Sequence, residues 1–156
     1  MSHTKETDIW LEDFLTDLLG LMNLDVWVAQ LDINETDRIY TAILDGSDKA
    51  RIIGRDGQVL DAIQHLAIAS AANEGIVDDR IVVDAGDYRE RRDARILEDA
   101  QAAISKVLKK QQTVNLPPMP SRERRMVHMA AAAVDGVTTE SLGEGDDRYV
   151  RLFPAV

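Results

Sequence analysis

Two glycines stand three residues apart in the run IIGRDG at positions 52–57, directly before a helical pattern at 58–73. The pair predicts a tight turn at the start of a helix, where glycine lets the backbone approach a ligand closely. Free N–H groups at a helix start favour an anion such as phosphate. A plain strand-to-helix connection explains an isolated pair as well, so the context decides. Flanking apolar residues could line a groove for bases: Ile52, Ile53, Val59 and Leu60.

Apolar periodicity predicts an α-β-β-GxxG-α-β order for the first 85 residues. A helix is expected over 8–24, with one apolar face made of Leu11, Phe14, Leu15, Leu18 and Met22. Strands are expected over 26–33, 38–44 and 80–84, the first two as a hairpin. The first strand should place Trp27, Ala29, Leu31 and Ile33 on one face. The helix over 58–73 carries a stripe of Val59, Leu60, Ile63, Leu66 and Ala67, and we expect its His65 to be partly buried.

The remaining residues predict an α-β-α-β-β order. A helix from a capping-box-like Asp87 to about 111 should bury Leu97, Ala100, Ile104, Val107 and Leu108. A short strand is expected over 113–116, before prolines that forbid helix. Ser121 is the expected N-cap of a helix to about 134 that buries Val127, Ala130, Ala131 and Val134, and strands follow over 137–142 and 148–153. The fold class is therefore α+β, in two small domains over 1–86 and 87–156.

Charge is distributed unevenly along the 156 residues, whose net charge is −10. Residues 86–125 hold 10 Lys and Arg against 6 Asp and Glu, a net charge of +4, whereas residues 1–50 hold 3 against 11, a net charge of −8. An acidic chain with one basic segment repels polyanions in general but can hold one at a defined place.

Arg124 and His128 are four residues apart on the expected helix, so both project from one side. A solvated helix face with an ion pair explains this spacing, and we favour that interpretation when the pair is taken alone. Arginine can also bind phosphate in a bidentate way, and histidine can donate a hydrogen bond to it. The pattern alone leaves both interpretations open.

The run YRERR at 88–92 lies at the expected domain junction. It is typical of a charged helix start with internal pairs. Arginine at a helix N-terminus opposes the helix dipole, however, so a ligand would explain the three arginines, Arg89, Arg91 and Arg92, more easily. The alternative is thus a basic bridge between the GxxG loop and the later helix.

Five motifs together resemble the KH–R3H part of the Jag family, also called KhpB or EloR: IGRDG (53–57), YRERR (88–92), PMP (118–120), RRMVH (124–128) and GVTTES (136–141). The resemblance spans about residues 8–154 and implies a type II-like KH domain followed by an R3H domain. Many members carry a further amino-terminal domain, which we expect this chain to lack.

The resemblance implies a single-stranded RNA-binding protein that acts as an RNA chaperone or post-transcriptional regulator, with effects on cell elongation and peptidoglycan homeostasis. KH domains clamp about four unpaired nucleotides with the GxxG loop. Asp56 departs from the family, in which basic or polar residues are more usual, and should weaken phosphate binding. The implied RNA-binding residues are Ile53, Gly54, Arg55, Asp56, Gly57, Arg89, Arg92, Arg124, Arg125 and His128.

Other function classes have less support in the sequence. No common catalytic motif occurs, so an enzyme is not expected. Cysteine is absent, which excludes disulfides and thiolate metal sites, and we expect no cofactor. With no signal-peptide pattern and no membrane-length apolar run, the expected location is cytoplasmic. A protein-interaction module that docks a small KH-only, KhpA-like partner remains the alternative, and single-stranded DNA in place of RNA stays open.

Overall fold

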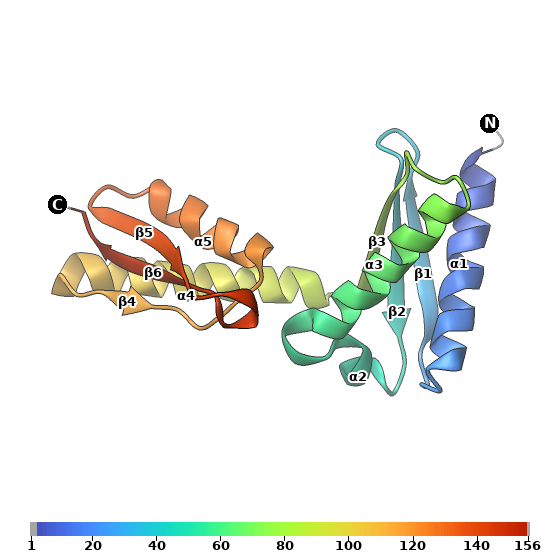
Figure 1. Ribbon diagram of the computed structural model, residues 1–156, viewed down its shortest axis with the longest axis horizontal. Helices are drawn as coiled ribbons and strands as arrows, with labels where there is room; N and C mark the ends of the chain where they lie inside the picture. The colour runs from blue at the N-terminus through green and yellow to red at the C-terminus, as the bar shows by residue number, and fades with distance from the viewer. Residues whose placement is uncertain (1–2, 156) are drawn as a thin grey trace. The chain divides into compact units, whose positions relative to one another are not determined.

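The computed structural model describes residues 3–155, which form two compact units that divide after Arg89. The first unit contains α1 (His3–Leu21), β1 (Trp27–Asn34), β2 (Ile39–Asp45), α2 (Lys49–Ile53), the short 3-10 helix η1 (Arg55–Gly57), α3 (Gln58–Asn73) and β3 (Arg80–Ala85). Helix α4 (Tyr88–Lys110) begins at its end. The second unit continues through β4 (Val114–Asn115), α5 (Ser121–Ala132), β5 (Val137–Leu142), η2 (Gly145–Asp147) and β6 (Tyr149–Pro154) (Figure 1).

The predicted α+β class with two small domains is confirmed. The expected boundary at residue 86 stays a prediction. Among the described residues, no helix has both the length and the apolar character that a membrane crossing would need.

The first unit has a three-stranded sheet in the order β1-β2-β3. Strands β1 and β2 form the predicted antiparallel hairpin, and β3 pairs with β2 in parallel. A parallel pair needs a crossover connection, and α2, η1 and α3 supply it. The crossover therefore carries the GxxG segment.

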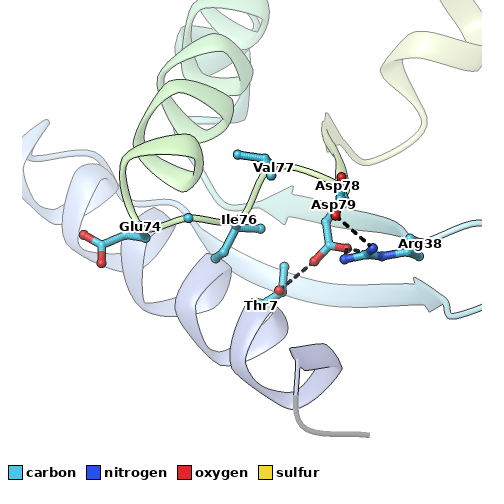
Figure 2. Close-up of a pocket in the computed structure, with 8 residues that line it drawn as sticks. Thr7, Arg38, Glu74, Ile76, Val77, Asp78 and Asp79 are labelled. Atoms are coloured by element: carbon cyan, nitrogen blue, oxygen red, sulfur yellow. Dashed lines mark hydrogen bonds and ion pairs between the residues drawn. The ribbon is translucent and has the colours of Figure 1, made fainter.

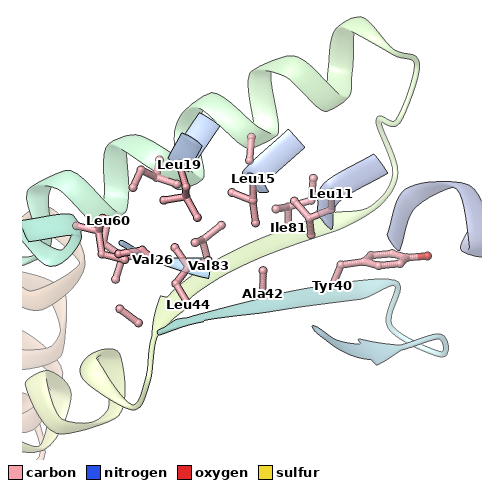
Figure 3. Close-up of a cluster of buried hydrophobic side chains, with 14 of the residues drawn as sticks. Leu11, Leu15, Leu19, Val26, Tyr40, Ala42, Leu44, Leu60, Ile81 and Val83 are labelled. Carbon is pink, nitrogen blue, oxygen red and sulfur yellow. The ribbon is translucent and has the colours of Figure 1, made fainter. Parts of the chain in front are cut away.

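The core of the first unit lies between the sheet and its helices (Figure 3). Leucines of α1 meet alternate residues of β2 and β3 there, because every second side chain of a strand points to one face. The fully buried members are Leu11, Leu15, Leu19, Ala42, Leu44, Ile52, Leu60, Ala67, Ala71, Val83 and Ala85. This core fixes the end of α2 and the start of α3, and so both sides of the GxxG turn.

The expected face of β1 is wrong at its first half. Val28 pairs with Leu44 and Gln30 pairs with Ile43, so Ala29 is an extra residue in a β-bulge. A bulge reverses the alternation on one side of it. Val28 therefore packs on the core together with Leu31, whereas the Trp27 side chain is 53% exposed.

The second unit has a sheet in the order β4-β6-β5, with both pairs antiparallel. Helices α4 and α5 contribute to the core that the sheet completes. Its buried members include Ile96, Ala100, Val107, Leu116, Val127, Ala131, Val150 and Leu152. Thr139 pairs with Leu152 and Ser141 with Val150, so these two hydroxyl side chains share the sheet face of the core.

Several predicted helix faces are rotated by about one residue, because apolar side chains also occur beside each true stripe. In α4, Leu97 and Leu108 are exposed, and Ile96 and Ala103 are buried in their place. In α3, Leu66 is 48% exposed, and His65 is exposed too, so its expected partial burial is wrong. Helix α1 ends at Leu21, one residue before the exposed Met22. Helix α2, only five residues long, was not predicted at all.

Candidate functional site

The GxxG segment forms a turn whose shape depends on backbone angles that favour glycine. Gly54 has φ 71° and ψ −170°, a combination that is almost restricted to glycine. Asp56 and Gly57 also have positive φ angles, 52° and 81°. Aspartate tolerates the left-handed region better than most residues. The turn ends helix α2 and starts helix α3 within four residues.

Close contacts surround both glycines. A Cβ at Gly54 would lie 2.5 Å from Val59 Cγ2, and a Cβ at Gly57 would lie 2.9 Å from Tyr88 Cε1. The Tyr88 ring at the start of α4 thus packs directly on the loop. Glycine is therefore favoured at both positions by its lack of a Cβ as well as by the positive φ angle.

Three other predicted residues belong to this loop. Ile53 is half-buried and packs on the core of the first unit. Arg55 is exposed, and its guanidinium has no hydrogen bond or ion pair with any described residue. The exposed Asp56 puts a carboxylate beside it. The loop therefore offers one uncommitted cation next to one anion.

Arg89 lies beside the first turn of α3, which follows the GxxG loop. Its Nη1 donates to Asp61 Oδ1 at 2.8 Å, and its Nη2 donates to Gln64 Oε1 at 3.3 Å. Its Nε donates to the Val83 carbonyl at 3.0 Å. The structure thus brings Arg89 next to the loop, but three of its five N–H groups bind protein acceptors.

Gln64 and Arg89 together occupy the free side of β3. The Val83 N–H donates to Gln64 Oε1 at 3.0 Å, while the Val83 carbonyl accepts from Arg89. Both main-chain groups of Val83 therefore have side-chain partners.

Arg124 is half-buried on α5 and is held from three directions. Its Nε donates to the Met119 carbonyl at 3.2 Å, its Nη2 to Ser121 Oγ at 2.5 Å, and its Nη1 to Ser141 Oγ at 3.5 Å. The expected role of Ser121 is wrong, because α5 has Pro120 as its N-cap and no side-chain capping bond. The Ser121 hydroxyl accepts from Arg124 instead.

His128 lies one turn further along α5 and contacts two hydroxyls of β5. Its Nδ1 lies 2.7 Å from Thr139 Oγ1, and its Nε2 lies 2.8 Å from Ser141 Oγ. Burial, and then the positive charge of Arg124, lower the pKa of His128 below its usual 6.5. The imidazole is therefore neutral at physiological pH.

Arg92 and Arg125 differ in environment. Arg92 makes a two-bond ion pair with Glu123, with both N–O distances 2.9 Å, and the Glu123 residue is only 4% exposed. Asp93 and Arg122 form a second ion pair between the same two helices. Arg125 is exposed and has no partner among the described residues. Within the second unit the structure brings Arg124 and His128 together and ties Arg92 to a buried acid.

A hollow of about 270 Å³ lies at the far end of α3, next to the loop over 74–79 (Figure 2). Asp79, whose side chain is 2% exposed, accepts hydrogen bonds there from Thr7 (2.7 Å) and Arg38 (2.7 Å). The polar groups satisfy one another, and α3 separates them from the GxxG loop by about 24 Å. The hydrogen bonds of Asp79 at this hollow tie together three segments of the first unit, which explains its polar residues by a structural role. No group of three or more metal-binding side chains occurs among the side chains described, those of residues 7–155.

The sequence interpretation did not identify the hydroxyls that hold Arg124 and His128. Alternation along the strand expected over 137–142 would have placed Thr139 and Ser141 on one face. It could not have shown that this face meets α5. Gln64, Asp61 and Glu123 carried no distinguishing pattern.

Comparison with known proteins matches both halves of the chain. The model of the KhpA/KhpB KH domain matches residues 10–84, and the model of the R3H domain matches residues 95–154. The RNA-binding protein KhpB of Clostridium symbiosum is 34% identical over 88% of this chain and 62% of its own length. KhpB of Lactiplantibacillus plantarum is 34% identical over 78% of this chain and 38% of its own length. KhpB of Bacillus subtilis is 28% identical over 78% of this chain and 60% of its own length. The chain thus spans between about two fifths and three fifths of these relatives.

Proposed function

Because the chain belongs to the KhpB family of KH–R3H proteins, we propose that it binds single-stranded RNA through both domains, 1–86 and 87–156. The observation that carries the proposal is the GxxG turn, which leaves the Arg55 guanidinium exposed beside the start of α3, unpaired with any residue that the structure describes. In KH domains this loop clamps the backbone of unpaired nucleotides. The relatives named above are RNA-binding proteins, which supports the assignment.

The second domain contributes Arg124 and Arg125 to the proposed surface, and His128 lies one turn from Arg124 on the same helix. Arg124 keeps two of its five N–H groups without a protein partner, and Arg125 is exposed. A permanently charged guanidinium with open donors suits a phosphate. Arg89 and Arg92 are the less favoured contacts of the predicted set, since each is bound to protein acidic groups.

The finer role that we propose is that of an RNA chaperone or post-transcriptional regulator in the cytoplasm, with effects on cell elongation and peptidoglycan homeostasis. It is a binding role without catalysis. A KhpA-like protein is the proposed partner, in keeping with the family model that covers both proteins.

Docking of that partner with little RNA binding is the second candidate function. Large apolar side chains are exposed on the first unit, including Leu21 at 87% and Trp27 at 53%. Apolar side chains such as these are covered more favourably by an apolar partner surface than by a phosphate backbone.

The decisive experiment measures fluorescence anisotropy of a labelled single-stranded 12-mer RNA of mixed sequence. We expect Arg55→Asp and the double variant Arg124→Ala/His128→Ala each to weaken binding. Arg80→Asp makes the same charge change on an exposed residue of β3 and should have a smaller effect. With three to five phosphate contacts, log affinity should fall against log salt with a slope of about −2 to −4. Absence of binding to any single-stranded RNA or DNA at low salt would refute the proposal and favour partner docking.

A further inference from the structure

Both ring nitrogens of His128 are already occupied within the second unit. A neutral imidazole has one N–H donor and one acceptor nitrogen. Thr139 Oγ1 and Ser141 Oγ lie 2.7 and 2.8 Å from these two nitrogens, so both groups are satisfied by hydroxyls of β5. No ring nitrogen is left to donate to a phosphate unless one of these bonds breaks.

We propose that His128 is a positioning residue and does not contact phosphate, and that it acts through Ser141 on Arg124, the group that binds the phosphate. This inference rests on the proposed RNA-binding function. Ser141 Oγ is the link, because it lies 2.8 Å from His128 Nε2 and 3.5 Å from Arg124 Nη1.

The bonds around Arg124 support this division of roles. Ser121 and the Met119 carbonyl hold two corners of the guanidinium plane, and Ser141 receives the third. A planar fork fixed in this way keeps its two remaining N–H groups in a constant orientation. A preorganised donor loses less conformational entropy when a phosphate binds.

Charge around the imidazole supports the same conclusion. On α5 the nearest influence is the positive Arg124, which together with burial disfavours a protonated ring and lowers the pKa of His128. From β5 the ring meets two uncharged hydroxyls. The intervening Glu140 is on the other face of the strand, where it pairs with Arg151 at 3.3 Å. No described carboxylate therefore faces the ring to stabilise an imidazolium ion.

The first test is the pH dependence of binding to the labelled 12-mer RNA between pH 7.5 and 6.0. A histidine that contacts phosphate gains charge on binding, so affinity should rise as the pH falls. A neutral positioning histidine gives unchanged or weaker binding. The comparison is made against His128→Gln, which removes the titration of this residue and leaves His65 in place. Tighter wild-type binding at pH 6.0 that is lost in His128→Gln would overturn the proposal.

The second test removes the hydroxyls and keeps the ring. In the double variant Thr139→Val/Ser141→Ala we expect affinity to fall about fivefold, the size of one net hydrogen bond. His128→Ala should lose about as much, and combining the two changes should add little. Thr138→Val, the same kind of substitution on the exposed face of β5, is the matched control. If the double variant binds like wild type while His128→Ala does not, His128 contacts the RNA itself.

The third test is independent of RNA and uses nitrogen-15 NMR of the 156-residue chain. We expect a single neutral tautomer of His128 and a slowly exchanging Arg124 Nε–H, both altered in Ser141→Ala and unaltered in Thr138→Val. Two interconverting tautomers in the wild type would overturn the proposal. Should the wild type bind no RNA, the proposed function fails on the anisotropy result, whereas the link from His128 to Arg124 is still decided by these signals.

Discussion

The two candidate phosphate sites are constructed differently. In the first unit the site is a backbone turn with three positive φ angles in four residues, and its cation, Arg55, has no hydrogen-bond or ion-pair partner in the part of the chain that the structure describes. In the second unit the backbone is an ordinary helix and strand, and hydrogen-bonded side chains position Arg124. The shape of a backbone site should be sensitive to glycine substitution, whereas exchange of its exposed side chains should leave that shape intact. A side-chain site should show the reverse.

Substitution of Gly54 should have the largest effect. Gly54→Ala combines a glycine-only backbone angle with a Cβ 2.5 Å from Val59, which together should cost roughly 3 kcal/mol in free energy of unfolding. Gly75→Ala is the matched control, since Gly75 has φ 83° but nothing within 4 Å, and about 1 kcal/mol is expected. Urea unfolding followed by tryptophan fluorescence reports this unit, which contains both tryptophans, Trp10 and Trp27. Equal losses of unfolding free energy in Gly54→Ala and Gly75→Ala would contradict a destabilising contact between the new Cβ and Val59.

Removal of Glu123 should have the next largest effect, this time on the second unit. Glu123→Ala leaves the guanidinium of Arg92, only 20% exposed, without its two-bond partner and should cost about 2 kcal/mol. Glu140→Ala breaks an exposed pair with Arg151 and should cost less than about 1 kcal/mol. Circular dichroism during urea unfolding, compared with the tryptophan signal, separates this unit from the first. Similar losses in the two variants would show that burial of the first pair adds nothing.

Neutralising Asp56 should strengthen the backbone site. Asp56→Asn keeps a residue that tolerates φ 52° and removes the carboxylate beside Arg55. A unit charge near a phosphate in water contributes somewhat under 1 kcal/mol, so RNA affinity should rise about two- to fivefold. The anisotropy assay measures this change, and Asp8→Asn on α1 serves as the charge control. No gain would mean that Asp56 lies away from the bound phosphate.

The smallest expected effect concerns pH and the side-chain site. Since the folded chain holds the pKa of His128 below 6.5, the unfolded chain takes up the proton more readily. The stability from this residue is present above pH 6.5 and is lost as the pH falls through 6.5 towards the folded pKa. His128→Gln should show less decline of second-unit stability between pH 7.5 and 5.5 than wild type. An equal decline of stability in wild type and His128→Gln would mean that protonation of carboxylates, and not of His128, causes the acid sensitivity.

Regular patterns made most of the fold predictable. The helix over 58–73 and the strand over 137–142 have the predicted bounds, because glycine or polar residues end each pattern sharply. Helix α2 was missed, since five residues are too short for periodicity. The bulge at Ala29 leaves no mark in the alternation of apolar residues.

The candidate sites were predictable to different degrees. Two glycines at fixed spacing identify the backbone turn directly. Both partners of His128, and the Ser141 hydroxyl that Arg124 shares with it, come from β5, more than ten residues away, and only folding brings them together. Sequence could therefore suggest the cations but not their positioning groups.

The partners of Val83 have a consequence for self-association. An edge strand of a sheet has unpaired main-chain N–H and C=O groups, to which a strand of another chain can hydrogen-bond. Side chains of Gln64 and Arg89 already fill this position on β3. At the opposite border, the bulge in β1 interrupts the regular spacing that an incoming strand would need. We therefore expect this three-stranded sheet to resist the addition of a further strand at both edges.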